Sequence, residues 1–294
     1  MITKFSLLWK SNKKQWLWYI IPSIIVISLI IITIGLQNIE EEEIEKSFKK
    51  NQINVQETTV KAISKNISSE LELLITEMKN LSENDEIQED LGTDRSNRII
   101  QQTFERMNTI APTAQILAVD KNYVVLSQVS HRQESYIGKK LVGVSLLLNN
   151  QKDKRTQIVI ATVRNDPFLE PEIAIIVPII EKETQTLKGH ILVTIQPNQF
   201  FAKHGNIYDV DTQFLVVLDK NFIILTYPNN DLVGDNFFDQ DIRNIDNIKT
   251  LREHYKKIGL GTSETITFDD VNDDDLIYSS IPIYINEKLN YYSL

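Results

Sequence analysis

The chain has 294 residues, enough for one large or two ordinary domains, and its 42% hydrophobic and 24% charged residues exclude a collagen-like or wholly disordered protein. Residues 1–36 carry four lysines and no acid, whereas residues 37–294 carry the other 27 of the 31 basic groups and all 40 acidic groups. A body with a formal charge of −13 repels nucleic-acid phosphates, and the lack of cysteine excludes disulfides and thiolate catalysis.

An uncharged run of 21 residues, Trp16 to Leu36, predicts a membrane-spanning helix. At about 1.5 Å per residue it covers the roughly 30 Å hydrocarbon core. A cleaved signal peptide shares the basic lead, but its apolar region is only about 7–15 residues and ends at a small-residue site. We favour an uncleaved anchor, because the run leads into four glutamates at 40–43 without such a site. The positive-inside rule then places residues 1–15 in the cytoplasm and the rest outside.

A long helix is predicted to follow. Between Ile39 and Leu81 the sequence has neither proline nor glycine, and apolar residues recur every three or four positions from Val60 onward. The stripe is either a coiled-coil seam or a face that packs on the next domain. We favour packing, since the clean repeat covers only about three heptads. A further short helix is predicted over Asn97–Ile110.

An internal repeat follows the helices. Residues 116–126 (ILAVDKNYVVL) recur as residues 215–225 (LVVLDKNFIIL), with an offset of 99 residues between Asp120 and Asp219. Asp-Lys-Asn between two β-rich runs is typical of a hairpin turn, where Asp and Asn bond their own backbone. The sequence therefore predicts two homologous modules.

Two further landmarks recur in the same order. Each copy reaches an aliphatic-glycine pair at Gly138 or Gly234, where a tight turn with positive φ is expected. Each then reaches an apolar strand that contains Pro178 or Pro282. Because proline has no amide donor, both are predicted on an edge strand or at a bulge.

This arrangement resembles the double Cache family, the extracellular PAS-like sensor modules of chemoreceptors and sensor kinases. Residues 189–195 (GHILVTI) resemble the strand that closes the membrane-distal module in that family, and the resemblance covers about residues 38–285. It implies an α+β fold with an N-terminal membrane helix, a long exposed helix and two tandem PAS-like modules with central antiparallel sheets.

The resemblance also implies domain boundaries. These are a cytoplasmic tail (1–15), a transmembrane helix (16–36), a helical stalk (37–94), a membrane-distal module (95–195), a linker (196–204) and a membrane-proximal module (205–294). Receptors of this kind usually return through the membrane to a cytoplasmic output part. We expect either a reading frame interrupted after Leu294 or output through a partner or the single anchor, and slightly favour the first.

No catalytic constellation stands above chance, so we expect no enzyme, no cofactor and no metal. The four histidines are far apart, and the sequence has no glycine-rich phosphate loop and no nucleophile elbow. The acidic run at 269–275 supplies oxygen ligands for calcium but lacks the glycine and final glutamate of an EF-hand. A solvated hairpin tip is the favoured interpretation.

A sensor instead needs a few polar groups in an apolar wall. In the first module the predicted ligand-binding residues are Tyr123, Ser127, His131, Arg132, Tyr136, Arg164 and Asp166. Arg164 and Asp166 follow an apolar strand, so they either clamp a carboxylate or an amine at its mouth or simply pair with each other. The amino-acid-binding branch carries an Arg-x-Trp-Tyr pattern that is missing here, which disfavours an amino-acid ligand.

The leading hypothesis is a membrane-anchored extracellular sensor for signal transduction or chemotaxis that binds a small solute in its distal module. Expected partners are the solute, the membrane through residues 16–36, and a second copy or a partner receptor, but not nucleic acid. The alternative is a cell-surface interaction module without a small ligand. An exported enzyme is a distant third, because no acid, base or nucleophile set is visible.

Overall fold

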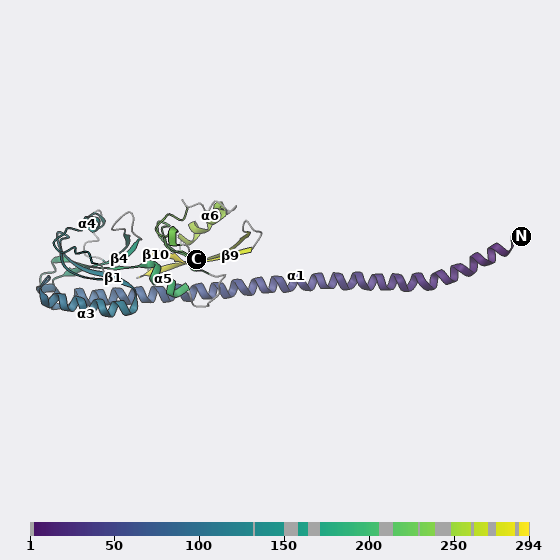
Figure 1. Cartoon of the computed structure of the whole chain (residues 1–294), viewed down its shortest axis with the longest axis horizontal. Coiled ribbons are helices and arrows are strands. Elements are labelled where there is room, and N and C mark those ends of the chain that lie inside the picture. The colour runs from purple at the N-terminus through teal and green to yellow at the C-terminus, as the bar shows by residue number, and fades with distance from the viewer. Residues whose placement is uncertain are drawn as a thin grey trace. The chain divides into compact units, whose positions relative to one another are not determined.

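The computed structural model describes residues 3–131, 133–149, 158–163, 171–205, 214–228, 230–238, 248–259, 262–269, 275–285 and 288–293. The chain divides into two units, Met1–Val55 and Gln56–Leu294, which are considered separately. Figure 1 shows the helix α1 (Thr3–Ser82), which begins in the first unit and ends in the second.

The first unit is helical and carries the predicted membrane span. Its large apolar side chains between Ile24 and Leu36 are 52–65% exposed. One stretch is long and apolar enough to cross a membrane, with a mean hydropathy of 2.0 over its best 18 residues and none of that window buried. So much apolar surface is unfavourable in water and favourable in a hydrocarbon layer. This stretch overlaps the membrane-spanning run predicted from the sequence.

In the second unit, the apolar stripe of α1 packs on the protein's own sheets. Ile67, Leu71, Leu74 and Met78 are all 0% exposed and belong to one core with residues of both sheets. The packing interpretation of the stripe is therefore confirmed for this part of the helix.

Two shorter helices follow α1. Helix α2 (Asp85–Glu89) is capped by Asn84, and α3 (Asp94–Ile110) begins with a capping box between Thr93 and Ser96. Figure 1 shows α3 alongside the end of α1, and the Arg106 guanidinium lies 3.2 Å from the Glu77 carboxylate of α1. The helix predicted over Asn97–Ile110 thus begins one turn earlier.

The first copy of the repeat, for which we keep the name distal module from the sequence-based expectation, is a five-stranded antiparallel sheet of order β2-β1-β5-β4-β3. Its strands are β1 (Thr113–Asp120), β2 (Val125–Ser130), β3 (Val159–Val163), β4 (Glu172–Ile180) and β5 (Leu187–Ile195), and helix α4 (Val142–Asn149) lies between β2 and β3 in sequence. The segment predicted to close this module is β5, which lies at its centre. Its side chains alternate between a face toward α1 and an outer face.

The proximal module repeats this topology in the order β7-β6-β10-β9-β8. Helix α5 (Pro197–Gly205) precedes it, over the predicted linker. The elements of the module are β6 (Val217–Asp219), β7 (Ile224–Thr226), a 3₁₀ turn η3 (Asn230–Leu232), α6 (Ile248–Gly259), β8 (Glu264–Asp269), β9 (Asp275–Ile285) and β10 (Lys288–Ser293). The last strand in sequence again pairs with the first, Tyr292 opposite Leu218.

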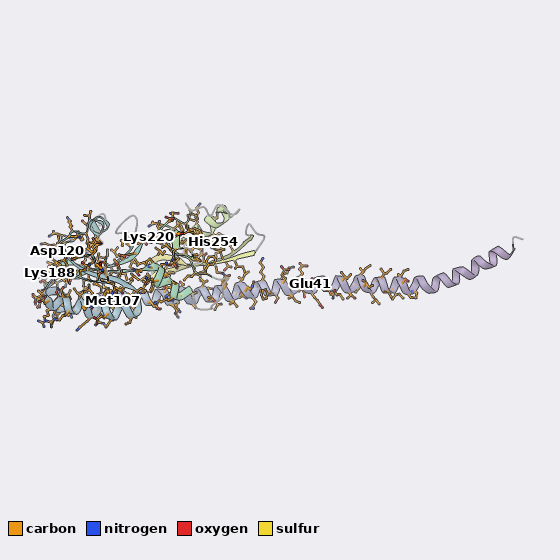
Figure 2. The ribbon with its side chains drawn as sticks, viewed as in Figure 1. Glu41, Met107, Asp120, Lys188, Lys220 and His254 are labelled. Carbon is orange, nitrogen blue, oxygen red and sulfur yellow. The ribbon has the colours of Figure 1, made fainter. Side chains whose placement is uncertain are left out.

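The two Asp-Lys-Asn turns are equivalent bond by bond. The Asp120 carboxylate accepts from the amides of Asn122 (2.8 Å) and Val124 (2.9 Å). The Asp219 carboxylate accepts in the same way from Asn221 (2.7 Å) and Ile223 (2.9 Å). Figure 2 labels Asp120 in the first turn and Lys220 in the second. The predicted equivalence of these aspartates is confirmed.

The glycines also occupy matching positions. Gly138 (φ 79°) donates its amide to the Val125 carbonyl, and Gly234 (φ 96°) donates to the Ile224 carbonyl, both at 2.8 Å. A positive φ is accessible to glycine at no steric cost. The predicted positive-φ turns are therefore confirmed in both modules.

The prediction for the prolines was wrong in part. Pro178 and Pro282 lie on β4 and β9, which are inner strands of their sheets rather than edge strands. Each proline lies two residues beyond the last residue of its strand that pairs with the neighbouring edge strand. That last residue is Ile176 in β4 and Ser280 in β9. An inner strand tolerates proline here because its neighbour on one side has already ended.

Candidate functional site

The two faces of the distal sheet have different roles. Ile116, Ala118 and Val193 face the core that includes α1, whereas Leu117, Val119 and Leu192 face outward into a second apolar cluster. The outer cluster also includes side chains from α4 and from the loop before it. The outer face is therefore the wall against which a solute-binding site can form.

A row of small and polar residues crosses the outer face on all five strands. We call it the polar row; in sheet order it consists of Ser130, Gln115, Thr194, Ala174 and Ala161. The next row along the sheet is bulkier and includes Leu117, Leu192, Ile176 and Val159. Small side chains leave more space above the sheet than leucine or isoleucine does.

Two buried polar atoms of the polar row have no hydrogen-bond partner within the described protein: Gln115 Oε1 and Thr194 Oγ1. Their residues are 2% and 4% exposed, and they lie opposite each other on β1 and β5. A buried polar group without a partner costs about 1–3 kcal/mol, so native proteins satisfy most such groups with protein, water or ligand. The sequence analysis did not identify this pair.

Tyr123 and His190 lie further along the same face. Tyr123 is 5% exposed with φ 67°, His190 is fully buried, and their rings stack 5.7 Å apart at 19°. Tyr123 was predicted as a site residue and lies on the outer face, within the outer cluster. His190 was not selected, because an isolated histidine in a strand gives no signal of its partners.

Ser127 was predicted to line the site but lies on the opposite face of the sheet. It pairs with Ala118, is 1% exposed and donates its hydroxyl to Asn97 of α3. The β-bulge where Ala118 and Val119 meet β2 shifts the alternation by one residue, and a sequence pattern does not reveal such a shift. The neighbouring Gln128 faces the loop instead, accepting from the Tyr136 amide at 2.6 Å.

The other predicted residues divide into two groups. Tyr136 packs against the outer cluster, and its hydroxyl donates to the Glu134 carboxylate at 2.8 Å. His131 is exposed and lies beside Phe104, with ring centroids 4.8 Å apart. Arg132, Arg164 and Asp166 lie outside the described residues, as does most of the acidic run at 269–275.

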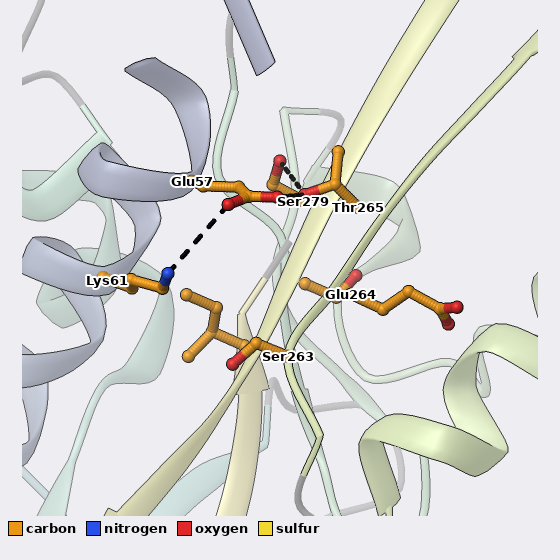
Figure 3. A pocket seen from close by; sticks show the side chains of 8 residues that line it. Glu57, Lys61, Ser263, Glu264, Thr265 and Ser279 are labelled. Carbon is orange, nitrogen blue, oxygen red and sulfur yellow. Dashed lines mark hydrogen bonds and ion pairs between the residues drawn. The ribbon is translucent and has the colours of Figure 1, made fainter. Parts of the chain in front are cut away.

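The proximal module contains a small cleft of about 70 Å³ between α1 and the strands β8 and β9 (Figure 3). Thr265 donates its hydroxyl to Glu57 of the helix at 2.9 Å and lies 3.0 Å from the Ser279 hydroxyl, while Lys61 lies 4.0 Å from Glu57. Figure 3 shows the Glu264 side chain turned away from Glu57 and Lys61.

In the described part of the chain, no group of three or more His, Asp or Glu is arranged to hold a metal.

Glu264 instead contacts a buried histidine. His254 of α6 lies 3.0 Å from the Glu264 carboxylate through Nδ1 and 2.7 Å from the Ser280 hydroxyl through Nε2. Burial lowers the pKa of His254 below 6.5, and Glu264 opposes this only partly. Burial likewise lowers the pKa of His204. Both imidazoles are therefore harder to protonate in the folded protein than in the unfolded chain.

These shifts predict acid sensitivity. Below pH 6.5 the unfolded chain binds more protons than the folded one, so the free energy of unfolding falls as pH decreases from that value. Urea unfolding of the full chain in detergent should show this loss, and His254→Gln should reduce it. The exposed control His131→Gln should leave it unchanged, whereas an identical pH profile in His254→Gln would contradict the assignment.

No protein-family model matches the sequence, and no curated protein matches it. Solved structures do match. The periplasmic sensory domain of the Campylobacter jejuni chemoreceptor Tlp1 superposes with a TM-score of 0.60 at 16% identity, over 83% of this chain and 94% of that one. The chain therefore shares the fold of solved extracellular sensor domains. The α+β fold expected from the sequence is confirmed.

Two further matches extend the comparison. An extracellular ligand-binding receptor from Desulfohalobium retbaense has a TM-score of 0.59 at 16% identity. The match covers 80% of this chain but only 38% of the receptor chain. The ligand-binding domain of the Pseudomonas fluorescens chemoreceptor CtaA, solved with L-serine, has a TM-score of 0.57 at 12% identity over 83% of this chain and 96% of that one. Sensor domains of histidine kinases also match. The matched structures are described as sensory, extracellular or ligand-binding domains and receptors.

Proposed function

We propose that the chain is a membrane-anchored receptor whose distal module, residues 95–195, binds a small solute outside the cell. Residues 16–36 cross the membrane and residues 1–15 lie in the cytoplasm. The observation that carries the proposal is the outer face of the distal sheet, where buried polar groups, among them Gln115, Thr194 and His190, occur among apolar side chains. Such a combination is typical of small-molecule sites.

The packing supports a route from this face to the rest of the second unit. Ile116 of β1 and Val193 of β5 alternate with the outer-face residues and pack in one core with Leu71 of α1. The same core includes Val217 and Ile283 of the proximal module, residues 205–294. A solute that shifts the distal strands therefore acts on side chains in direct contact with the helix.

A thermal-shift screen of the full chain in detergent against small metabolites tests the proposal. A solute that binds only the folded state stabilises it by about 2.7 kcal/mol at a hundredfold excess over its Kd. If the solute is anionic, Arg164→Ala should abolish the shift, because losing a charge-assisted pair costs about 1.5–3 kcal/mol. A cell-surface interaction module without a ligand predicts no shift with any metabolite.

We further propose that a second copy of the chain is a partner of the first unit. Ile44, Phe48 and Val55 lie four and seven residues apart on α1 and are 68%, 61% and 55% exposed. Heptad-type spacing of large apolar residues is the pattern of a two-helix seam. Phe48→Glu should convert a dimer in membrane nanodiscs to monomers, as measured by mass photometry. Lys50→Glu, a change of charge outside the seam, should leave it dimeric, and a Phe48→Glu dimer of unchanged affinity would contradict the seam.

A further inference from the structure

We infer that the solute of the distal module is an uncharged polar molecule that donates hydrogen bonds, and that Gln115 and Thr194 are its contacts on the sheet. The inference rests on the proposed function and specifies the chemical class of its ligand. It starts from the two buried oxygens of the polar row, Gln115 Oε1 and Thr194 Oγ1, which have no partner within the described protein.

The two residues form one binding surface because they are direct cross-strand neighbours. Gln115 lies opposite Thr194, and Thr194 lies opposite Ala174 on the next strand. Side chains that face each other across an antiparallel pair have Cβ atoms about 4.5–5.5 Å apart. One small molecule can therefore contact both polar groups while it lies over the small side chain of Ala174.

The chemistry of these groups selects the ligand class. The glutamine oxygen only accepts hydrogen bonds, and the threonine hydroxyl both accepts and donates, so the pair matches neutral donors such as hydroxyl and amide groups. Both side chains are neutral. The amide oxygen and nitrogen of Gln115 can be assigned in either of two orientations, and the side chain is neutral in both.

The surrounding charges disfavour an anion at this position. Glu172, which is 3% exposed, lies two residues before Ala174 on the same face of β4. Among the described residues, the polar row and the bulkier row beside it contain no lysine or arginine. A buried anion needs a counter-charge or several donors. The two unpartnered oxygens of the polar row both accept hydrogen bonds, and of these two only the Thr194 hydroxyl can also donate one.

Melting of the full chain in detergent, with two sets of probes, tests the inference. The neutral set is myo-inositol, acetamide and nicotinamide, and the anionic set is acetate, succinate and inorganic phosphate. We expect a neutral probe to raise the melting temperature of the wild type and to bind about tenfold more weakly to Thr194→Val and Gln115→Met. Both variants should fold, because each replaces an unpaired buried oxygen with an apolar group of similar size.

The control is Thr113→Val. It makes the same change at a different buried threonine, which lies on β1. Its hydroxyl donates to the Ala111 carbonyl at 3.1 Å, so this variant should retain the response to the probe. A shift with anions only, lost in Arg164→Ala and kept in Thr194→Val, would overturn the ligand class and leave the proposed function standing. If neither set shifts the wild type, both proposals fail.

Discussion

Leu71→Ala should destabilise the second unit by about 2–5 kcal/mol. Leu71 is 0% exposed and is part of the core in which the stripe of α1 packs against strands of both sheets. Removing its branched side chain leaves a cavity that the surrounding strands fill only in part. Urea unfolding of the full chain in detergent, followed by far-ultraviolet circular dichroism, measures the loss.

Leu73→Ala is the matched control, because it makes the same chemical change two residues away on the same helix. Leu73 is 47% exposed, so its truncation should change the free energy of unfolding by about 0.5 kcal/mol or less. Equal effects of the two substitutions would show that the stripe is not buried on the sheets and would contradict the packing of α1.

Gly189→Ala should have the second large effect, a loss of more than about 3 kcal/mol or failure to fold. Gly189 lies on β5 between Asp120 of β1 and Ile179 of β4. A Cβ built on it overlaps the Val119 carbonyl oxygen and lies 3.0 Å from that carbonyl's carbon. Backbone atoms in a paired strand cannot move aside as a flexible side chain can, so the central ladder of the distal sheet must separate.

Gly143→Ala tests whether the effect is specific to that position. Gly143 lies in α4, and a Cβ there meets no atom within 4 Å. Alanine is favoured over glycine in a helix by about 1 kcal/mol, so this variant should be as stable as the wild type or more so. A folded Gly189→Ala with wild-type stability would contradict the close approach of β5 to β1.

Much of the fold was predictable because it depends on local chemistry. The Asp120 and Asp219 turns, the glycine turns and the apolar stripe of α1 all depend on residues close in sequence. The positions of Pro178 and Pro282 were not predictable to the same degree. They depend on where a neighbouring strand ends, which is a property of the whole sheet.

The site was harder to predict than the fold. Tyr123, a predicted site residue, lies on the outer face, whereas Ser127 lies on the opposite face because a bulge shifts the register of β2. Gln115 and Thr194 are 79 positions apart in sequence and become neighbours only when β5 pairs with β1. An isolated Gln or Thr inside an apolar strand carries no sequence signal of such a partner.

Native mass spectrometry of the full chain, before and after exposure to a small-metabolite extract, tests the central claim most directly. We expect a bound small molecule on the wild type and a marked loss of that molecule in Thr194→Val. The control Thr265→Val, which deletes a hydroxyl in the proximal cleft, should retain the bound molecule. An unchanged mass after exposure, or an adduct that persists in Thr194→Val and disappears in Thr265→Val, would contradict a sensor whose site lies in the distal module.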